Sequence, residues 1–541
     1  MKTIRKIWRN IKIQPDTWLF CGFLLTFTLS VRKVFFYFPN QGTFNEYTGI
    51  YLYTSDIFLF LAIFSYFTIL CNNKEFMSMY KLWITKLIHN LSLLIPLFIV
   101  ILSFLSILWS QNKSIAEYQS IKLFEFYLLY LYTSLRVIPY FLSRNSKLFH
   151  VEQFITLIVG IGFIQSIIGV AQFSLQHSIG LIWLKESIIS PSIPGVAKII
   201  LDNHKIIRAY GLMPHPNILG GFLSLCIILL LYLTRIFHGQ NQEPHNNTQI
   251  VPRGTISAST SKPQKKTDYP YILLKKSLFK NKWLIYCIFL VLALGLLLTL
   301  SKSAILGLFL ALVYIFIIVP RGTNATLGNQ LLINFKRQIY SLKEMFHVEH
   351  SRIFIISLAI IIISSFLILK PSLHSIFIQS LEERGIYLDI SYHAIIANPL
   401  IGIGAGQFVW KMQDFSSMIL SSWQYQPVHN VFLLIWSELG IVGLGLFTWL
   451  IWTLFYSSES PIVPRGTIGE KTIATKENLA GDSIAILDNT FHVLSTESIL
   501  PYFKAIFLSF LFIMLFDHYF WDIQQGSLML WMVMGVIAGI E

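Results

Sequence analysis

Residues 283–318 read WLIYCIFLVLALGLLLTLSKSAILGLFLALVYIFII, in which two apolar runs flank the polar pair Ser301-Lys302. Similar runs recur along the chain, and about 20 apolar residues in helical form cross the hydrocarbon core of a bilayer. Hydrophobic residues make up 54% of the sequence and charged residues only 13%, which excludes an ordinary soluble domain. The sequence therefore predicts an all-α polytopic membrane protein, because a helix satisfies all its backbone hydrogen bonds internally.

The apolar runs predict about twelve transmembrane helices. These spans are expected to begin near Trp18, Tyr51, Ile88, Ile121, Phe154, Ile218, Trp283, Ala304, Ile353, Ile441, Tyr502 and Leu528. With the N-terminus inside, most of the 41 Lys and Arg residues fall in inside segments, as the positive-inside rule requires. The expected location is the cytoplasmic membrane. The excess basic charge then reflects topology and anionic lipid; nucleic acid is not an expected partner, since no aromatic-basic binding module is present.

Two extracytoplasmic loops are predicted to be long, about 44 residues after the fifth span and about 60 after the ninth. The chain divides into 1–207 (five helices and the first long loop), 208–457 (a core with cytoplasmic insertions 238–282 and 320–352), 458–500 (a low-complexity cytoplasmic loop) and 501–541 (the last helices). The words VPRGT (251–255, 319–323, 463–467) and FHVE (149–152, 346–349) repeat in predicted inside loops or at their edges. We interpret them as tolerated insertions, with a docking motif as the alternative.

Both long loops end in a Pro-His-Asn cluster just before a helix, at 214–217 and at 427–430. Asparagine is a good helix N-cap, and the positive ends of both helices then face the same outer compartment. Arg208, Arg384 and Lys302 add positive charge at this mouth. The arrangement predicts a site for a phosphate or diphosphate.

The stretch 429–443 reads HNVFLLIWSELGIVG, which is His-Asn, nine residues, then Gly-x-x-Gly. Nine residues are too few to cross a bilayer, so we expect a partly embedded helix from His429 and the true span from Gly440. A polar, titratable pair at a membrane surface is not required by packing and indicates function.

These motifs resemble those of the bacterial O-antigen ligase and O-antigen polymerase superfamily. The resemblance rests on the histidine motif at 429–443, on Arg-x-x-Gly…Pro-Asn at 208–217 and on Glu-Arg…Asn-Pro-Leu-Ile-Gly-Ile-Gly-Ala-Gly at 383–406. It implies transfer of a glycan from a polyprenyl-diphosphate carrier to a hydroxyl on a glycan, lipid or protein acceptor, with no metal or other cofactor. It also implies a role in cell-surface polysaccharide assembly, such as that of lipopolysaccharide, with the active site on the extracytoplasmic face. Ser301-Lys302 stands where the family has Ser-Arg.

The chemistry of the residues agrees with this implication. Arg208 and Arg384 suit a diphosphate, because guanidinium binds phosphate bidentately and stays charged. His429 suits activation of the acceptor hydroxyl, because a neutral imidazole can take a proton near pH 7. No Asp-x-Asp occurs in the chain, so a metal-dependent mechanism is not expected. The expected substrate contacts are Asn430, His215, Asn217, Lys302, Gly404 and Gly406, with a structural role as the alternative for His215.

Other activities remain open at this point. A polysaccharide polymerase or a protein O-oligosaccharyltransferase shares the fold and the motifs. A lipid-linked sugar transporter or flippase would instead predict inverted repeats and charges near mid-membrane, and here the charges gather at the outer edge. A non-enzymatic scaffold leaves the convergent Arg and His residues unexplained.

Three further expectations concern polar residues near the mouth. Arg32-Lys33 falls near the outer end of the first span, where either snorkelling or a kinked helix would account for it. The aromatic residues of 517–521 are expected to form an interfacial belt, from which Asp517 or His518 reaches the mouth. Glu438 is expected to be a buried structural carboxylate.

Overall fold

The computed structural model describes residues 14–71, 85, 87, 90–142, 151–201, 204–239, 282–318, 374–456 and 499–540. Four helices in these ranges are long and apolar enough to cross a membrane, namely Thr54–Cys71, Val151–Leu175, Pro216–Ile236 and Val431–Tyr456, and five shorter apolar helices accompany them. The fold is that of a mostly helical, multi-pass membrane protein, but the count of twelve spans is not confirmed. The predicted span near Ile353 and all three VPRGT copies lie outside the described residues.

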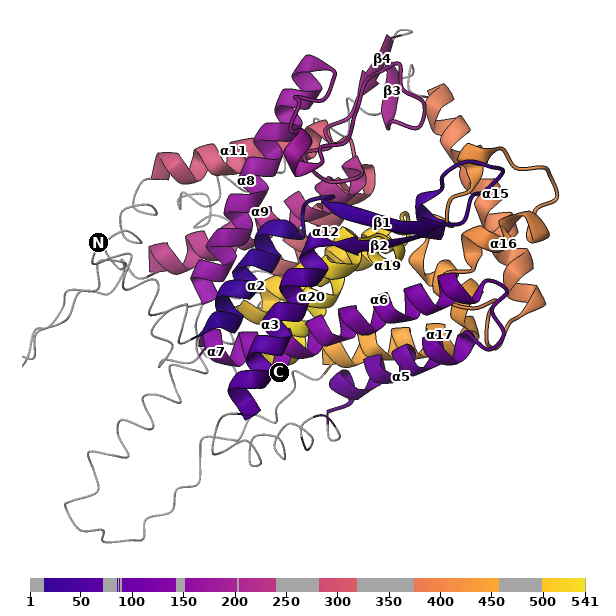
Figure 1. Ribbon diagram of the computed structural model, residues 1–541. Helices are drawn as coiled ribbons and strands as arrows, with labels where there is room; N and C mark the ends of the chain where they lie inside the picture. Colours follow the sequence, from indigo (N-terminus) through magenta and orange to yellow (C-terminus); the bar gives the residue numbers. More distant parts are fainter. Residues whose placement is uncertain are drawn as a thin grey trace, which may run out of the picture.

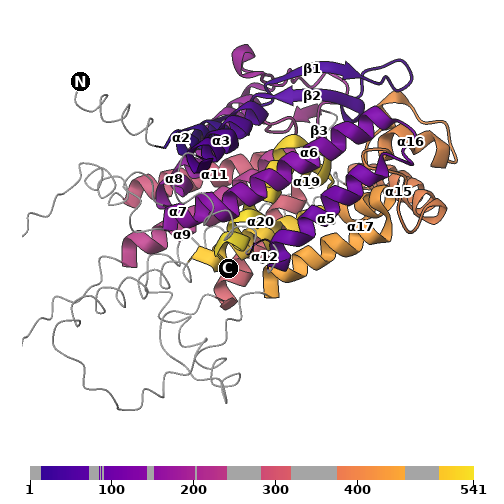
Figure 2. The same cartoon turned by 60° about the horizontal axis from the view of Figure 1, so that its bottom comes forward.

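Helices form one bundle (Figures 1 and 2). Their bounds are α2 (Pro15–Thr26), α3 (Thr54–Cys71), α5 (Leu91–Ser106), α6 (Lys113–Tyr132), α7 (Ile138–Leu142), α8 (Val151–Leu175), α9 (Pro216–Gly239), α11 (Lys282–Leu298), α12 (Lys302–Ile318), α15 (His374–Ala397), α16 (Phe408–Phe415), α17 (Val431–Tyr456), α19 (Tyr519–Asp522) and α20 (Gln524–Ile540). A π-helical turn, Thr133–Val137, joins α6 to α7, and a further apolar helix, Ile499–Met514, precedes α19.

The layers of the bundle follow from the pairing of these helices. Helix α2 packs on α3, α5 lies between α6 and α17, and α9 contacts α8, α11 and α12. Helix α20 packs against α6, and almost all its side chains are buried, including Trp531. A helix that is apolar on every side belongs in the centre of a membrane bundle.

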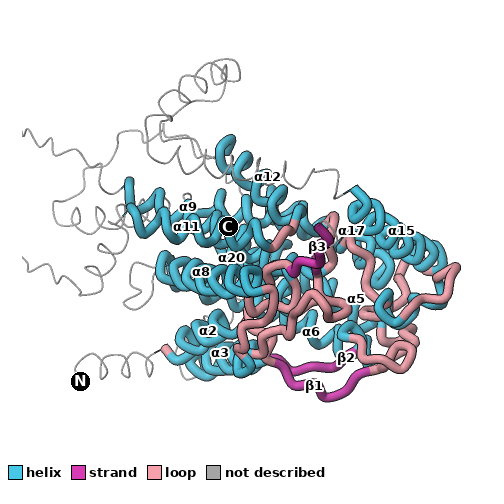
Figure 3. The backbone as a smooth tube through the Cα atoms, turned by 90° about the horizontal axis from the view of Figure 1, so that it is seen from above, coloured by secondary structure: helices cyan, strands magenta, loops and turns pink. Residues whose placement is uncertain are grey.

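Two β-hairpins correct the all-α expectation. Strands β1 (Arg32–Tyr37) and β2 (Gly49–Tyr53) are antiparallel, as are β3 (Lys198–Leu201) and β4 (His204–Ile207). The hairpins and the long loops gather at one end of the bundle (Figure 3). The first hairpin is tied to the segment before α17, since Asn45 in its turn donates to the Tyr425 carbonyl at 2.8 Å.

The expectation for Arg32 was wrong, because Arg32 lies on a strand instead of the end of a span. Its guanidinium pairs with Glu46 at 3.3 Å and donates to the Tyr53 hydroxyl at 2.9 Å. The aromatic ring of Tyr51 lies 4.3 Å below the guanidinium carbon. The charge is therefore compensated within the hairpin and does not need lipid headgroups.

The second predicted long loop is largely structured. Residues 374–430 contain α15, α16 and a 3-10 turn, Ser422–Gln424. Helix α15 packs along the first half of α17, with Ser391 and Ser437 hydroxyls 3.0 Å apart. Arg384 is thus carried by a helix, which positions it more rigidly than a loop would.

Helix α17 is broken at Gly440, as the histidine motif predicted. Gly440 has φ 68° and ψ −173°, a conformation outside the helical region. The break leaves helical carbonyls and amides unpaired, and the segment 399–404 satisfies them. Ile403 and Gly404 donate to the carbonyls of Ser437 and Glu438 at 2.9 Å, and Ile441 donates to the Pro399 carbonyl at 2.9 Å.

The glycine run therefore approaches protein backbone and not a ligand at Gly402. A Cβ atom on Gly402 would lie 2.3 Å from the Glu438 carbonyl oxygen, and one on Gly440 would lie 2.1 Å from the Leu400 carbonyl oxygen. Only glycine, which has no Cβ atom, permits these two backbone segments to come this close.

Candidate active site

Three titratable side chains meet at the hairpin end of the bundle, and two of them come from a single turn. His429 lies just before α17, while Asp517 and His518 lie between helix Ile499–Met514 and α19. The Nδ1 atom of His429 is 4.0 Å from Oδ1 of Asp517, and the His429 and His518 rings are 5.0 Å apart between centroids. The sequence allowed for a residue of this turn to reach the mouth, and both Asp517 and His518 do so.

The aromatic belt expected at 517–521 is wrong. Tyr519, Phe520 and Trp521 are buried in the core, where the Phe520 ring packs on Phe510 and the Trp521 ring on Phe447. These packed rings fix the turn that presents Asp517 and His518. The short turn was misread because its aromatic composition fits both a membrane interface and a core.

Arg208 is connected to this cluster through Asn217. The Arg208 guanidinium donates from Nη2 to Asn217 Oδ1 and from Nε to the Thr299 carbonyl at 2.6 Å. The Asn217 amide then donates to Asp517 Oδ2 at 2.5 Å. A second oxygen of the same carboxylate accepts the backbone amide of His518 at 2.9 Å. Asp517 is thus fixed from both sides.

The cap of α9 differs from the expectation. His215, not Asn217, precedes the helix, and its carbonyl accepts the amides of Ile218 at 3.1 Å and Leu219 at 3.3 Å. Its Nδ1 accepts the Asn217 amide at 3.2 Å. This leaves the Asn217 side chain free to join Arg208 to Asp517, and the contacts of His215 favour its structural alternative.

Asn430 caps α17, as expected from its position. Its Oδ1 accepts the Leu433 amide at 3.0 Å, and its Nδ2 donates to the Leu515 carbonyl at 3.2 Å. The second bond joins the start of α17 to the chain entering the Asp517 turn. Both ends of the amide therefore hold the site together, and direct substrate contact by Asn430 stays a prediction.

Arg384 and Lys302 complete a positive rim. Arg384 lies on α15, and Lys302 is the first residue of α12, at the predicted tip between two helices. Arg384 is close enough to act electrostatically on both Lys302 and His429, and Arg208 also acts on Lys302. Within the described ranges the Arg384 guanidinium makes no hydrogen bond or ion pair, so it is available to an anion.

Burial and neighbouring charges separate the protonation states of the cluster. Burial, with the nearby cations His518 and Arg384, lowers the pKa of His429 to about 3 despite the opposing Asp517 carboxylate. Burial also lowers the pKa of Arg208 to about 10, which leaves it charged at neutral pH. His429 is therefore neutral in the ligand-free protein and able to accept a proton.

Asp517 and His518, in contrast to His429, are both held in their charged forms. Burial disfavours the Asp517 carboxylate, but His518, His429 and His215 outweigh it and hold its pKa below the ordinary 3.8. Burial likewise disfavours the His518 imidazolium, yet Asp522 and Asp517 outweigh it and raise its pKa above 6.5. The Nδ1 atom of His518 lies 2.9 Å from Asp522 Oδ1. The cluster thus holds a neutral His429 between an anion and several cations.

The remaining predicted residues lie beside this cluster. A Cβ atom on Gly404 would meet the Ser110 hydroxyl at 2.1 Å, and one on Gly406 would meet Gln119 at 3.2 Å. Both glycines permit contacts within the protein, and their contact with substrate stays a prediction. Glu438 is buried and accepts the Phe408 amide at 3.4 Å, which agrees with a structural carboxylate.

The same cluster offers donor atoms for a metal ion. One atom each from His429, Asp517 and His518 lies within 4.8 Å of the other two. Two imidazoles and one carboxylate are a known ligand set for transition metals. The cations Arg208, Arg384 and Lys302 disfavour a further positive charge here, so we retain metal-free chemistry as a prediction that a chelator tests.

An apolar groove of about 670 Å³ begins next to the cluster, between α15 and the first half of α17. It is lined by Leu388, Ser391, Tyr392, Ile395, Ile396, Pro399, Leu433 and Trp436. Leu388 lies one helical turn after Arg384 on α15, and Leu433 lies in the first turn of α17, which His429 precedes. The groove therefore leads from the charged site along the helices.

Comparison with known proteins covers part of this site. Residues 287–448 match the family model described as O-Antigen ligase. The match includes Lys302, Arg384 and His429 and leaves Arg208 and Asp517 outside. A search of the curated proteins finds no match to the chain. Together with the histidine motif at 429–443, this match supports a relationship of the segment to the O-antigen ligase superfamily.

Proposed function

We propose that this protein transfers a glycan from a polyprenyl-diphosphate carrier to an acceptor hydroxyl, as a metal-independent membrane glycosyltransferase of polysaccharide assembly. The observation that supports it best is the neutral His429 placed between the Asp517 carboxylate and the cationic rim of Arg208, Arg384 and Lys302. A base beside an anion-binding rim is what attack of a hydroxyl on a diphosphate-linked sugar requires.

The rim would bind the diphosphate of the donor. Arg384 has its guanidinium available, and a guanidinium binds phosphate oxygens bidentately. Arg208 already gives two donors to Thr299 and Asn217, so its contribution is mainly its charge and the position of Asn217. As the glycosidic bond breaks, negative charge grows on the departing diphosphate, and these fixed cations stabilise it.

His429 would take the proton of the acceptor hydroxyl. The acceptor oxygen forms a bond to the anomeric carbon, the bond from that carbon to the diphosphate oxygen breaks, and polyprenyl diphosphate leaves. A diphosphate bound at Arg384 neutralises one of the cations that lower the pKa of His429, which makes the imidazole a stronger base when donor is present. Asp517, 4.0 Å away, stabilises the imidazolium that forms.

The apolar groove would hold the first isoprene units of the carrier. Its lining is almost entirely hydrocarbon, and it starts one helical turn after Arg384 and at the first turn of α17, which His429 precedes. A soluble nucleotide-sugar donor has no use for such a groove, which favours a lipid-linked donor. The site would face the extracytoplasmic side of the cytoplasmic membrane, where such carriers present their glycans.

The decisive experiment uses purified protein in liposomes with a polyprenyl-diphosphate oligosaccharide and with H429A in parallel. Release of polyprenyl diphosphate and product length are measured with and without candidate acceptors. A ladder from donor alone identifies a polymerase, whereas a single product that requires an added glycan, lipid or protein identifies a ligase or protein glycosylase. Wild-type release no faster than that of H429A across a broad acceptor panel refutes the transferase and favours a transporter. Full activity after EDTA treatment is expected.

A further inference from the structure

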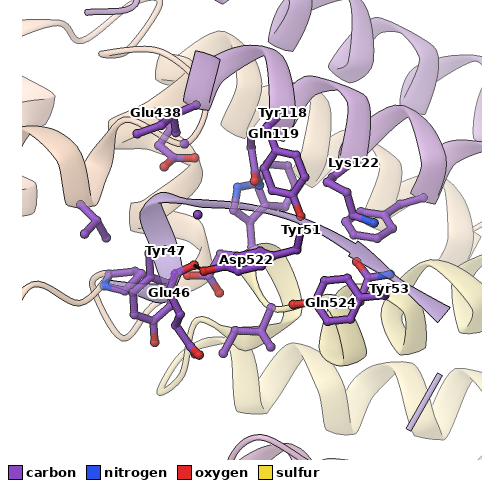
Figure 4. Close-up of a pocket in the computed structure, with 18 of the residues that line it drawn as sticks. Glu46, Tyr47, Tyr51, Tyr53, Tyr118, Gln119, Lys122, Glu438, Asp522 and Gln524 are labelled. Atoms are coloured by element: carbon purple, nitrogen blue, oxygen red, sulfur yellow. Dashed lines mark hydrogen bonds between the residues drawn. The ribbon is translucent and has the colours of Figure 1, made fainter. Parts of the chain in front are cut away.

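A separate polar cavity of about 70 Å³ is lined in part by Asp522, the partner of His518 (Figure 4). The first hairpin and η1 (Glu46–Thr48) line it together with α6, α17 and α19. Its ionisable side chains are Arg32, Glu46, Tyr47, Tyr51, Tyr53, Tyr118, Lys122, Glu438 and Asp522. Figure 4 shows Glu46 and Asp522 close together on one side of the cavity and Lys122 on the other. Nothing in the proposed transfer step uses this space.

Asp522 connects the cavity to the active site. Its Oδ1 lies 2.9 Å from His518 Nδ1, and His518 in turn packs against the His429 ring at 5.0 Å between centroids. One side-chain nitrogen or oxygen atom from each of His429, Asp517 and His518 lies within 4.8 Å of the other two, a separation short enough for one bridging water molecule. A line of titratable groups therefore leads from His429 to the cavity.

Unpaired polar atoms indicate that the cavity holds water. Asp522 Oδ2 and Gln524 Oε1 are buried and have no hydrogen-bond partner among the described residues, and both residues line the cavity. Buried polar atoms are normally satisfied, by ordered water where protein offers no partner. The volume admits a few water molecules, at roughly 10–15 Å³ each. It is far below the roughly 300–1,000 Å³ of small-molecule sites, which argues against a sugar subsite.

We propose that the proton taken up by His429 leaves the active site through His518 and Asp522 into the water of this cavity. This inference rests on the proposed function. His518 gives its Nδ1 proton to Asp522 and receives one on its other nitrogen from His429, directly or through one water. Asp522 then gives its proton to cavity water. One proton moves along the line and no electron is transferred. The relay leaves His518 protonated on its other nitrogen, and a flip of the imidazole ring then returns an N–H to Asp522 before the next turnover.

The surroundings of His518 suit such a step. It is faced by Asp517 and Asp522 from its own segment, by His429 and His215 from the two loop ends, and by Glu46 and Tyr47 from η1. Two carboxylates beside the ring stabilise the imidazolium through which the proton passes. In the ligand-free protein the His429 imidazolium is strongly disfavoured, so removal of its proton resets the base for the next turnover.

Asp522→Asn tests the relay in the full-length protein. An asparagine Oδ1 still accepts the His518 N–H bond, but the amide cannot take up and release the proton. We expect the rate of polyprenyl-diphosphate release to fall on the order of 10–100-fold with an unchanged KM for donor, since proton transfer is worth at least this much. Formate is small enough for the cavity and carries protons, so rising formate concentration is expected to restore D522N turnover.

The control is Asp389→Asn. Asp389 and His393 form an exposed i,i+4 pair on α15, with 3.6 Å between Oδ1 and Nδ1, so the same chemical change is made away from the cavity. D522N turnover equal to that of D389N and wild type overturns the relay, as does a loss that formate does not restore. In both cases wild-type release faster than H429A still supports the proposed transferase. Wild-type release no faster than H429A overturns both.

Discussion

His429 Nδ1 lies 4.0 Å from Asp517 Oδ1, although only the first of these two residues falls within the O-antigen ligase match. Hydrogen bonds from the Asn217 side chain and from the His518 backbone amide hold the Asp517 carboxylate in place, so it cannot turn away from His429 towards water. A histidine that must gain and lose a proton thus has a fixed negative partner.

Replacement of Asp517 by Asn removes the negative charge and keeps the size and shape of the side chain. We expect D517N to lower turnover on the order of 100-fold, because the His429 imidazolium loses its stabilising partner. Donor affinity should change little, since the carboxylate does not belong to the cationic rim. Release kinetics and direct donor binding in liposomes measure the two effects. H429A should lower turnover at least as much with donor binding retained; wild-type turnover in H429A would contradict the assignment of the base.

Alanine variants of the two rim arginines, Arg384 and Arg208, are expected to differ in their effect on stability. R384A should lower kcat/KM for donor about 100-fold at an unchanged melting temperature, because its guanidinium is available to the phosphate. R208A should lower both, because it also breaks bonds to Thr299 and Asn217. Donor titrations and thermal unfolding in detergent separate these outcomes. Equal loss of stability in both variants would show that Arg384 has a structural partner.

The break in α17 requires glycine at position 440. We expect G440A to destabilise the protein by about 2 kcal/mol or more, since its φ of 68° is strained for alanine and the new Cβ would meet the Leu400 carbonyl. Gly445 lies in the second half of the same helix, where a Cβ meets nothing within 4 Å. G445A is therefore the matched control, with unchanged or slightly higher stability. Similar unfolding temperatures for the two variants would refute a required break.

The stability of the protein should pass through a maximum near pH 6.5. Below this pH, His429 and His215 resist protonation in the folded state, since their pKa values are lowered to about 3. Acid therefore favours the unfolded chain. The His518 contribution has the opposite sign: its raised pKa makes it fully present below 6.5 and lost as pH rises through the folded value. D522N should flatten the alkaline limb of the unfolding temperature against pH, because Asp522 is a main cause of the raised pKa of His518, and D389N should keep this limb.

The groove can be filled without touching the charged rim. Ile396 lines it and is 58% exposed, and Ile317 on α12 is equally exposed outside it. We expect I396W to raise KM for a long-chain donor about tenfold, because indole occupies the space of the first isoprene units. The KM for a donor with a truncated carrier should change less. I317W is the control and should behave as wild type with both donors. An identical KM ratio in I396W and wild type would exclude the groove as the carrier site.

Much of this fold follows from local pattern. Apolar runs of spanning length predict helices whatever their neighbours, and the histidine motif predicted a helix that begins near His429 and breaks at Gly440. Both depend on residues close together in sequence. The hairpins were missed because strands of four to six residues beside long apolar runs have no periodic signal of their own.

The site was predicted in part for the same reason. Arg208, Arg384 and His429 stood out because each follows a loop signature, and the structure brings them to one rim. Asp517 and His518 were weighed only as an alternative, since a two-residue turn among aromatic residues carries no spacing rule. The role of Asn217 as a bridge was hidden by its position near a helix start, where the same side chain usually caps.

Attachment of the first hairpin through Asn45 to Tyr425 affects how this protein could be re-engineered. A chimera that exchanges only residues 287–448 with a relative would separate His429 from Asp517, from the Arg208 bridge and from the hairpin that closes the polar cavity. Donor or acceptor preference should therefore be transplantable only when all these pieces come from the same parent. Substrate preference would then depend on the whole loop end of the bundle, of which the matched segment 287–448 is one part.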